Sequence, residues 1–217
     1  MHRKNTPRNA RMEIKLTNAG KRYRFDWIFR NLSYTLQHGT KTALIGPNGS
    51  GKSTLLKTLA GHLSLSKGSL QFLNESGSNI PQESIYQYIS YTAPYIDLIE
   101  EFTLEEAIQF HVQLKPLLPN LTPEAILERL ELPKSRQKEL RYFSSGMKQR
   151  VKLALAIGSN APIVLLDEPS TNLDINAINW SHHLIKDWIG NRSLIIATND
   201  PGDLQLCNQQ LDIVHYK

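Results

Sequence analysis

A glycine-rich stretch, Gly46–Thr54, constrains this chain of 217 residues more than any other feature. Its letters, GPNGSGKST, match the phosphate-binding pattern G-x-x-x-x-G-K-[ST]. The apolar residues 41–45 before it predict a buried strand, and residues 54–60 after it predict a helix. This context favours a phosphate-binding loop over the alternative, a glycine-rich turn ahead of an ordinary helix.

The loop residues have expected roles in holding a nucleotide. Glycines let successive backbone N–H groups surround an anion, and the helix N-terminus behind them adds a partial positive charge. Lys52 is expected to reach the β- and γ-phosphates, and the Ser53 hydroxyl is expected to face Mg²⁺. The expected nucleotide-binding residues of this loop are Gly46, Pro47, Asn48, Gly49, Ser50, Gly51, Lys52, Ser53 and Thr54.

Composition limits the class of protein. The chain is 40% hydrophobic and 21% charged, which is typical of a globular α/β domain. No apolar run approaches about 18 residues, so we expect no membrane-spanning helix. The basic N-terminus has no apolar stretch behind it, so we expect no signal peptide. The single cysteine, Cys207, excludes an internal disulfide and is expected to be a packed thiol in a reducing compartment.

The formal net charge of +5 is concentrated at the N-terminus. Residues 1–11 contain no acid but hold four Lys and Arg residues, which are Arg3, Lys4, Arg8 and Arg11. We expect residues 1–11 to form a basic, disordered tail ahead of a single domain at 12–217, although such a tail could instead bind anionic lipid or nucleic acid. The rest of the chain shows no basic groove, so no nucleic-acid partner is expected.

Two types of patterning surround the phosphate-binding loop. Period-two segments at 13–17, 70–73 and 85–91 predict strands, and they favour an antiparallel layer built onto a parallel core. Helical patterning begins after Pro94, and Thr103 and Glu106 have the spacing of a capping box. We therefore expect a helical lobe at about residues 95–158, inserted into the core.

An acidic pair, Asp167 and Glu168, follows an all-apolar strand at 163–166. In open α/β sheets, ligands bind at the carboxyl ends of strands. Two carboxylates there are costly to bury without a cation, so we expect Asp167 to hold Mg²⁺. Glu168 is then placed to take a proton from an attacking water. The alternative is a turn that merely ends the strand.

Two further polar turns adjoin predicted elements. The turn at 143–146 precedes a helix at 147–157 and contains Ser144 and Gly146. Taken alone, it favours an N-capped helix over a second anion site. A last core strand at 194–198 leads to Asn199, whose side chain would lie beside a γ-phosphate, and a final strand is expected at 212–215.

The order and spacing of these motifs resemble the ATP-binding subunits of ABC (ATP-binding cassette) transporters. The matching segments are Gly46–Thr54, Phe143–Met147, Leu166–Pro169 and the D-loop-like Ser170–Asp174. The resemblance implies an α/β fold, with a P-loop NTPase core, an antiparallel β layer and the inserted helical lobe. It also implies that Tyr23, just after the first strand, stacks on adenine.

The resemblance implies a mechanism as well. Two cassettes would pair head to tail, as a homodimer or a heterodimer, with ATP and Mg²⁺ between them. Ser144 and Gly146 of one cassette would contact the γ-phosphate held by the other. The catalytic residues would be Lys52, Glu168 and Asn199. ATP hydrolysis would drive a separate transmembrane subunit, which would place this chain in the cytoplasm, on the inner face of the cell membrane.

Three departures from the family pattern qualify the expected activity. Phe-Ser-Ser-Gly-Met stands where the family has Leu-Ser-Gly-Gly-Gln, and 92–95 lacks the expected glutamine. Asn199 occupies the place of the switch histidine, and an amide cannot carry a proton. We therefore expect ATP binding with slow hydrolysis. The alternative function is a soluble ABC-type ATPase in cofactor or complex assembly, and a nucleic-acid-directed cassette protein is disfavoured.

Overall fold

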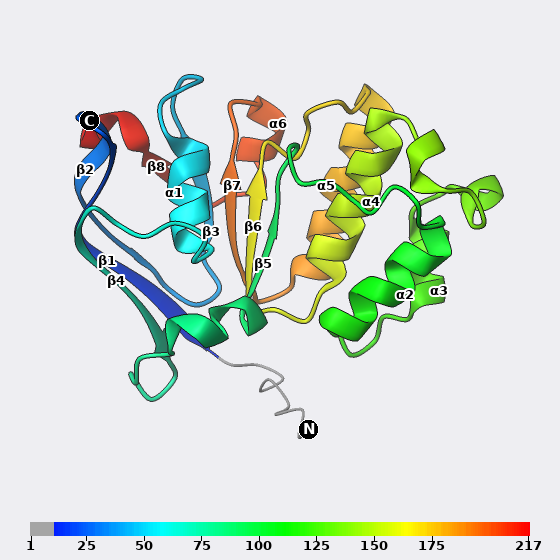
Figure 1. Ribbon diagram of the computed structural model, residues 1–217, viewed down its shortest axis with the longest axis horizontal. Coiled ribbons are helices and arrows are strands. Elements are labelled where there is room, and N and C mark those ends of the chain that lie inside the picture. Colours follow the sequence, from blue (N-terminus) through cyan, green and yellow to red (C-terminus); the bar gives the residue numbers. More distant parts are fainter. Residues whose placement is uncertain (1–10) are drawn as a thin grey trace. The chain divides into compact units, whose positions relative to one another are not determined.

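The computed structural model describes residues 11–217, so the expected basic tail lies outside the described residues except for Arg11. The described chain divides into two compact units (Figure 1). Unit 1 holds the described residues up to Tyr91, together with 161–167 and 191–217, and unit 2 holds 92–160 and 168–190. The assignment of 12–217 to a single cassette domain stays a prediction.

Unit 1 contains the expected antiparallel layer. Its strands are β1 (Met12–Tyr23), β2 (Asp26–Leu36) and β4 (Lys67–Asn74), in the order β2-β1-β4. Alternate apolar side chains such as Ile14 and Leu16 are buried in the core of the unit. Strand β1 is longer than the segment expected at 13–17, because register shifts after Leu16 let the chain continue pairing with β2 where the apolar alternation stops.

Unit 1 also contains the parallel core. Its strands are β3 (Lys41–Ile45), β5 (Ile89–Thr92), β6 (Ile163–Asp167), β7 (Ser193–Ala197) and β8 (Gln209–Asp212), in the order β5-β6-β7-β3-β8. Helix α1 (Lys52–Leu59) packs against β6 and β7, and the short α6 (Pro201–Leu204) follows β7. The expected combination of an antiparallel layer with a parallel core is confirmed.

Two expected strands are partly wrong. Within 85–91, the first residues belong to a 3₁₀ helix, Gln82–Gln87, and the strand begins only at Ile89. At the C-terminus, the strand ends at Asp212 and the chain continues as a 3₁₀ helix, Ile213–Tyr216. The Asp212 carboxylate accepts a hydrogen bond from Val214 N (2.9 Å), so this local cap starts the helical turn.

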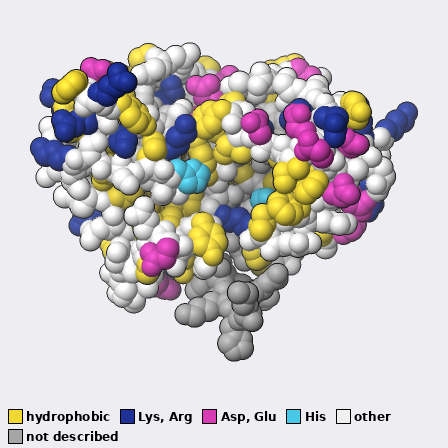
Figure 2. All heavy atoms as spheres, in the orientation of Figure 1, with side chains coloured by type: hydrophobic (Ala, Val, Ile, Leu, Met, Phe, Trp, Pro, Cys, Tyr) yellow, Lys and Arg dark blue, Asp and Glu magenta, His cyan; other side chains and the backbone are white. Residues whose placement is uncertain are grey.

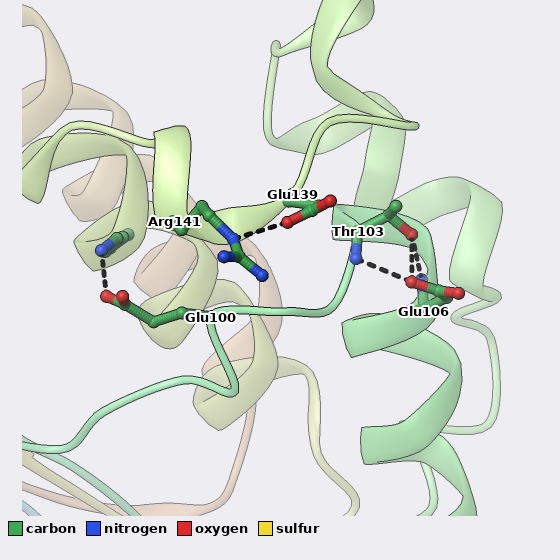
Figure 3. A network of polar contacts seen from close by, with 6 residues as sticks. Glu100, Thr103, Glu106, Glu139 and Arg141 are labelled. Carbon is green, nitrogen blue, oxygen red and sulfur yellow. Dashed lines mark hydrogen bonds and ion pairs between the residues drawn. The ribbon is translucent and has the colours of Figure 1, made fainter.

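Unit 2 is helical. Its helices are α2 (Leu104–Leu114), α3 (Pro123–Arg129), α4 (Ser145–Gly158) and α5 (Ile175–Ile189), with short 3₁₀ helices at Pro133–Ser135 and Leu140–Tyr142. In the expected capping box, Thr103 N donates to Glu106 Oε2 (2.8 Å) and Glu106 N donates to Thr103 Oγ1 (3.2 Å) (Figure 3). Across residues 11–217, no helix is both long and apolar enough to cross a membrane.

Unit 2 contains a half-buried histidine, His111 on α2. The Ser159 hydroxyl donates its proton to Leu155 O (2.6 Å). In its contact with His111 Nε2, 2.8 Å away, the hydroxyl oxygen therefore accepts and the imidazole donates. Burial, and secondarily the positive charge of Lys115, lower the pKa of His111 from 6.5 to about 4. The folded chain therefore resists protonation of this imidazole.

We expect this resistance to make unfolding pH-dependent. Between pH 6.5 and 4 the unfolded chain binds a proton at His111 and the folded chain does not, so the free energy of unfolding falls as the pH is lowered through this window. The expected loss is about 1–3 kcal/mol. Urea unfolding at several pH values would measure it. His111→Gln should remove this part of the pH dependence of the free energy of unfolding, whereas His183→Gln, at an exposed position, should not. The same pH dependence in the wild type and both variants would contradict the role given to His111.

Candidate nucleotide-binding site

Three adjacent strands of unit 1 bring the predicted site residues to one edge of the parallel sheet. Strand β7 lies between β6 and β3, and both pairings are parallel. In register, Asp167 of β6 lies beside Ala197 of β7, and Ala197 lies beside Leu44 of β3. The carboxyl ends of these strands therefore place Asp167, Asn199 and the start of the glycine-rich loop at the same edge.

The loop after β3 has a backbone shape that glycine alone accommodates without strain. Gly46 and Gly51 have φ values of 145° and 105°. A side chain on Gly46 would approach Ser50 Oγ to 2.7 Å, and one on Gly51 would approach the Ile28 side chain to 2.5 Å. The buried Ser50 hydroxyl makes no hydrogen bond. The loop thus curls into a tight cradle that has no room for a side chain at Gly46 or Gly51.

Helix α1 begins directly behind this loop, at Lys52. Its N-terminus has no side-chain cap and no acidic residue in the first turn, so the partial positive charge of the helix end is not neutralised locally. Lys52 is 5% exposed, and its ammonium donates to Gly46 O (2.7 Å) and, more weakly, to Pro47 O (3.4 Å). An ammonium, an uncapped helix end and a glycine cradle together fit a phosphate group.

Asn199 contacts this loop within unit 1. Its amide lies 3.0 Å from the Asn48 amide. With its nitrogen oriented toward Gly46 O (2.6 Å), its oxygen lies 3.3 Å from Lys52 Nζ. The adjacent Thr198 hydroxyl donates to the Asp203 carboxylate (2.7 Å), which fixes the turn that carries Asn199. Asn199 is thus held beside the atoms that would surround a phosphate.

Asp167 and Ser53 are the side chains of unit 1 that could hold a divalent cation. Asp167 is the last residue of β6 and is 1% exposed, and Ser53 lies in the first turn of α1. Residues 11–217 contain no cluster of three or more His, Cys, Asp and Glu side chains that could hold a metal. A hydroxyl and one carboxylate still fit Mg²⁺, which is commonly bound through one or two carboxylates together with substrate phosphates.

Tyr23 lies at the end of β1 and is 48% exposed. The Lys21 ammonium is 5.3 Å from the ring centroid, which is within the range of a cation–π contact. The ring therefore has a solvent-facing surface on which a base could stack.

The second predicted anion site lies in unit 2, at the N-terminus of α4. Ser144 caps this helix, because its Oγ accepts a hydrogen bond from Met147 N (3.2 Å). A side chain on Gly146 would approach Asn172 O to 3.0 Å, so the turn needs a small residue there. The expected N-cap is confirmed, and the Ser144 hydroxyl keeps its proton to donate to a further acceptor.

Glu168 lies in unit 2 on a tight turn. Its φ of 45° is in the left-handed region, which is uncommon for a residue other than glycine and is seen at functional sites. Thr171 Oγ1 donates to Glu168 Oε2 (3.3 Å), and Gln149 Nε2 donates to the neighbouring Pro169 O (3.0 Å). Sequence reasoning missed both Thr171 and Gln149. For Thr171, the signal in the sequence was its position three residues after Glu168, a spacing that allows a contact across a turn.

The cysteine that was expected to be a packed thiol, Cys207, lies in unit 1. Burial raises the pKa of the Cys207 thiol to about 12, so this cysteine is a packed thiol and a poor nucleophile.

Two of the known proteins with similar sequences are named as ATP-binding proteins. The ABC transporter family model matches residues 29–171. The cytochrome c biogenesis ATP-binding export protein CcmA of Agrobacterium fabrum is 30% identical over 199 residues, covering 89% of this chain and 92% of that protein. The lipoprotein-releasing system ATP-binding protein LolD 2 of Rhodospirillum rubrum is 27% identical, covering 86% and 85%. ABC transporter G family member 23 of Dictyostelium discoideum is 29% identical, but the chain spans only 28% of its length.

A solved structure shares the fold. The ATP-binding cassette MJ0796, described as a dimeric post-hydrolysis state bound to ADP and Pi, matches with a TM-score of 0.78 at 20% identity, covering 92% of this chain and 94% of that one. The expected P-loop NTPase fold is therefore confirmed. On the extent of the family match, together with the phosphate cradle at the edge of its parallel sheet, this chain belongs to the ABC transporter family.

Proposed function

We propose that this chain binds and hydrolyses ATP as the cytoplasmic subunit of an ABC transporter, on the inner face of the cell membrane. The observation that carries the proposal is the shared edge of β3, β6 and β7, where the phosphate cradle, Asp167 and Asn199 meet. Family membership supports the nucleotide and the reaction class.

Within this proposal the chain's own residues hold the nucleotide at defined atoms. The Lys52 ammonium exchanges its hydrogen bonds to loop carbonyls for bonds to β- and γ-phosphate oxygens, which are stronger charge-assisted bonds. Ser53 and Asp167 hold Mg²⁺, which would supply neutralisation of the phosphate charge when bound. Tyr23 stacks on adenine. Glu168, held by Thr171, accepts a proton from the attacking water.

A head-to-tail dimer would complete the site. Ser144 and the Gly146 N–H of one copy would approach the γ-phosphate held by the other, which explains why a second acid-free helix N-terminus follows a turn of small residues. The dimeric state described for the MJ0796 cassette supports this arrangement. A heterodimer with another cassette would use the same contacts.

Unit 2 has exposed apolar side chains suited to a protein partner. Figure 2 shows hydrophobic side chains on the surface in addition to charged ones. In unit 2 the large exposed ones include Tyr95, Ile99, Phe110 and Leu114, the last of which is 68% exposed. We propose that these side chains contact a membrane subunit, since the names of two similar proteins describe a lipoprotein-releasing system and an export protein. No nucleic-acid partner is proposed.

Co-purification from detergent-solubilised native membranes tests the coupling. A polytopic membrane protein recovered in a stoichiometric amount would support the transporter assignment. Recovery of the whole protein in the cytosolic fraction with a soluble partner would contradict it, and would favour the alternative, an ABC-type ATPase in cofactor or complex assembly. A matched preparation of a Leu114→Asp variant should recover less of a partner that binds the exposed face of α2.

We expect slow ATP turnover in the wild-type chain and faster turnover in Asn199→His. The Asn199 amide can donate a hydrogen bond to a γ-phosphate oxygen but cannot carry a proton, whereas a protonated imidazole makes the stronger, charge-assisted bond. The expected gain in kcat is about three- to tenfold, with KM for ATP little changed. Steady-state phosphate release would measure it, with Asn191→His, on an exposed turn, as the control. No gain over wild type would contradict the role given to Asn199.

A further inference from the structure

Two segments that are far apart in the sequence run side by side in unit 2. Leu104 N donates to Lys138 O (3.2 Å), Leu140 N donates to Phe102 O (2.9 Å), and Arg141 N donates to Glu100 O (2.9 Å). Figure 3 shows this region, with Glu100 and Thr103 on one segment and Glu139 and Arg141 on the other. The chain that leaves β5 is thereby tied to the chain that enters α4.

Helix α4 adds two side-chain contacts to the same segment. Lys148 forms an ion pair with Glu100. One helical turn later, Lys152 Nζ donates to Pro94 O (2.8 Å) and Ala93 O (3.3 Å). The Lys152 side chain thus contacts the stretch 92–95, in which the ABC transporter pattern has a glutamine and this chain has none.

Lys152 is in an unusual environment for a lysine. Lys152 is 8% exposed. Burial lowers the pKa of its ammonium, while the Asp97 carboxylate raises that pKa in part. Its hydrogen-bond partners are backbone carbonyl oxygens, so the attraction that offsets its desolvation depends on where residues 93 and 94 lie. Displacing that stretch would leave a buried ammonium without those partners, which is costly.

Helix α4 connects its own N-terminus to Lys152 and therefore to the stretch that Lys152 contacts. The helix begins at Ser145, behind the Ser144 cap, and Lys152 follows Ser144 by about two turns, or about 12 Å of helix. Because one continuous helix joins the two positions, a shift of its N-terminus would be transmitted to the ammonium and to the carbonyls that it holds.

We propose that Lys152 is a positioning residue that links the phosphate-facing N-terminus of α4 to the stretch 92–95. This inference rests on the proposed function, because it needs a phosphate at Ser144 and Gly146 to move α4. The link runs through a lysine on the helix rather than through a side chain of the stretch itself.

Amide hydrogen exchange and steady-state kinetics on one set of proteins test the link. Ile96 N donates to Ala93 O (3.1 Å), so the exchange rate of the Ile96 amide reports on the stretch that Lys152 holds. The set contains the wild type, Lys152→Met, Lys152→Arg and the control Lys186→Met, an exposed lysine on α5. Exchange at Ile96 and in the loop Gly46–Thr54 is measured with and without Mg-ATP, and kcat and KM for ATP are measured in parallel.

The expected results separate positioning from packing. Methionine keeps the bulk of the side chain but removes the donor, so Ile96 exchange without nucleotide should be about tenfold faster. Mg-ATP should slow Ile96 exchange in the wild type and in Lys152→Arg but not in Lys152→Met, while the loop stays protected in all of them. The kcat of Lys152→Met should fall about 2- to 30-fold at unchanged KM. Lys186→Met should match the wild type.

Three outcomes would overturn the inference, and they can be told apart. If Lys152→Met has the same Ile96 exchange rate and the same kcat as the wild type, the ammonium does not hold the stretch. If Lys152→Arg shows the same faster Ile96 exchange and lower kcat as Lys152→Met, a charged donor at this position is not enough, and the shape of the lysine side chain decides. Loop amides that Mg-ATP fails to protect in the wild type would contradict the proposed function and with it this inference. If Lys152→Met does not fold, Lys152→Leu, which also removes the donor, gives the same comparison.

Discussion

Replacing Glu168 by glutamine is expected to stop ATP hydrolysis while ATP binding persists. The amide keeps the size of the side chain and an oxygen that can accept the hydrogen bond from Thr171, but it cannot take a proton from water. Loss of a positioned general base lowers the rate by about 10²–10⁴-fold. The cradle around Lys52 is untouched, so the variant should bind ATP and accumulate as an ATP-bound dimer.

Single-turnover phosphate release and light scattering during size-exclusion chromatography would measure both effects. Glu128→Gln is a matched control, because Glu128 is an exposed carboxylate on α3. That control should hydrolyse ATP at the wild-type rate and dimerise no more than the wild type does. A Glu168→Gln chain that stays monomeric in saturating Mg-ATP would argue against the head-to-tail dimer.

Replacing Lys52 by alanine has the second large expected effect, a loss of nucleotide binding or turnover of about 100-fold or more. The ammonium is the only cation that the described residues of unit 1 bring into hydrogen bonds with the loop carbonyls of Gly46 and Pro47. Alanine is a good helix former at the first position of α1, so the helix should persist while the site loses its charge.

Equilibrium binding of a fluorescent ATP analogue, with the ATPase rate, would measure this loss. Lys57→Ala lies on the same helix, in its last turn, and serves as the matched control. The control should retain binding, and thermal unfolding of both variants would show that α1 is still folded. Unchanged binding and hydrolysis in Lys52→Ala would refute the role given to the glycine-rich loop.

The local motifs were predictable because their geometry depends on contiguous residues. The capping box of Thr103 and Glu106 and the N-cap at Ser144 satisfy backbone N–H groups within three residues. The glycines of Gly46–Thr54 allow the positive φ values that the loop needs. The uninterrupted apolar run of β6 likewise predicts a strand buried on both faces. These features carry their structural reason within one short segment.

Boundaries were less predictable where apolar periodicity and hydrogen bonding differ. The alternation in 85–91 suits a strand, but its first residues form a 3₁₀ helix with Ile85 buried. The opposite error occurred in β1, where pairing with β2 continues past the alternating residues. Periodicity reports which side chains are buried, and it does not specify the backbone partner that each residue finds.

By itself, the sequence determined the phosphate cradle, the strand that ends in Asp167, the family to which the chain belongs and the places where it departs from that family. Only the tertiary structure decided which distant residues meet. The strand order β6-β7-β3 brings Asn199 beside the loop residue Asn48, and the fold of unit 2 places Lys152 against carbonyls nearly 60 residues earlier in the chain. Such contacts depend on how crossover connections and helices pack, and a one-dimensional pattern of side-chain types carries no record of that packing.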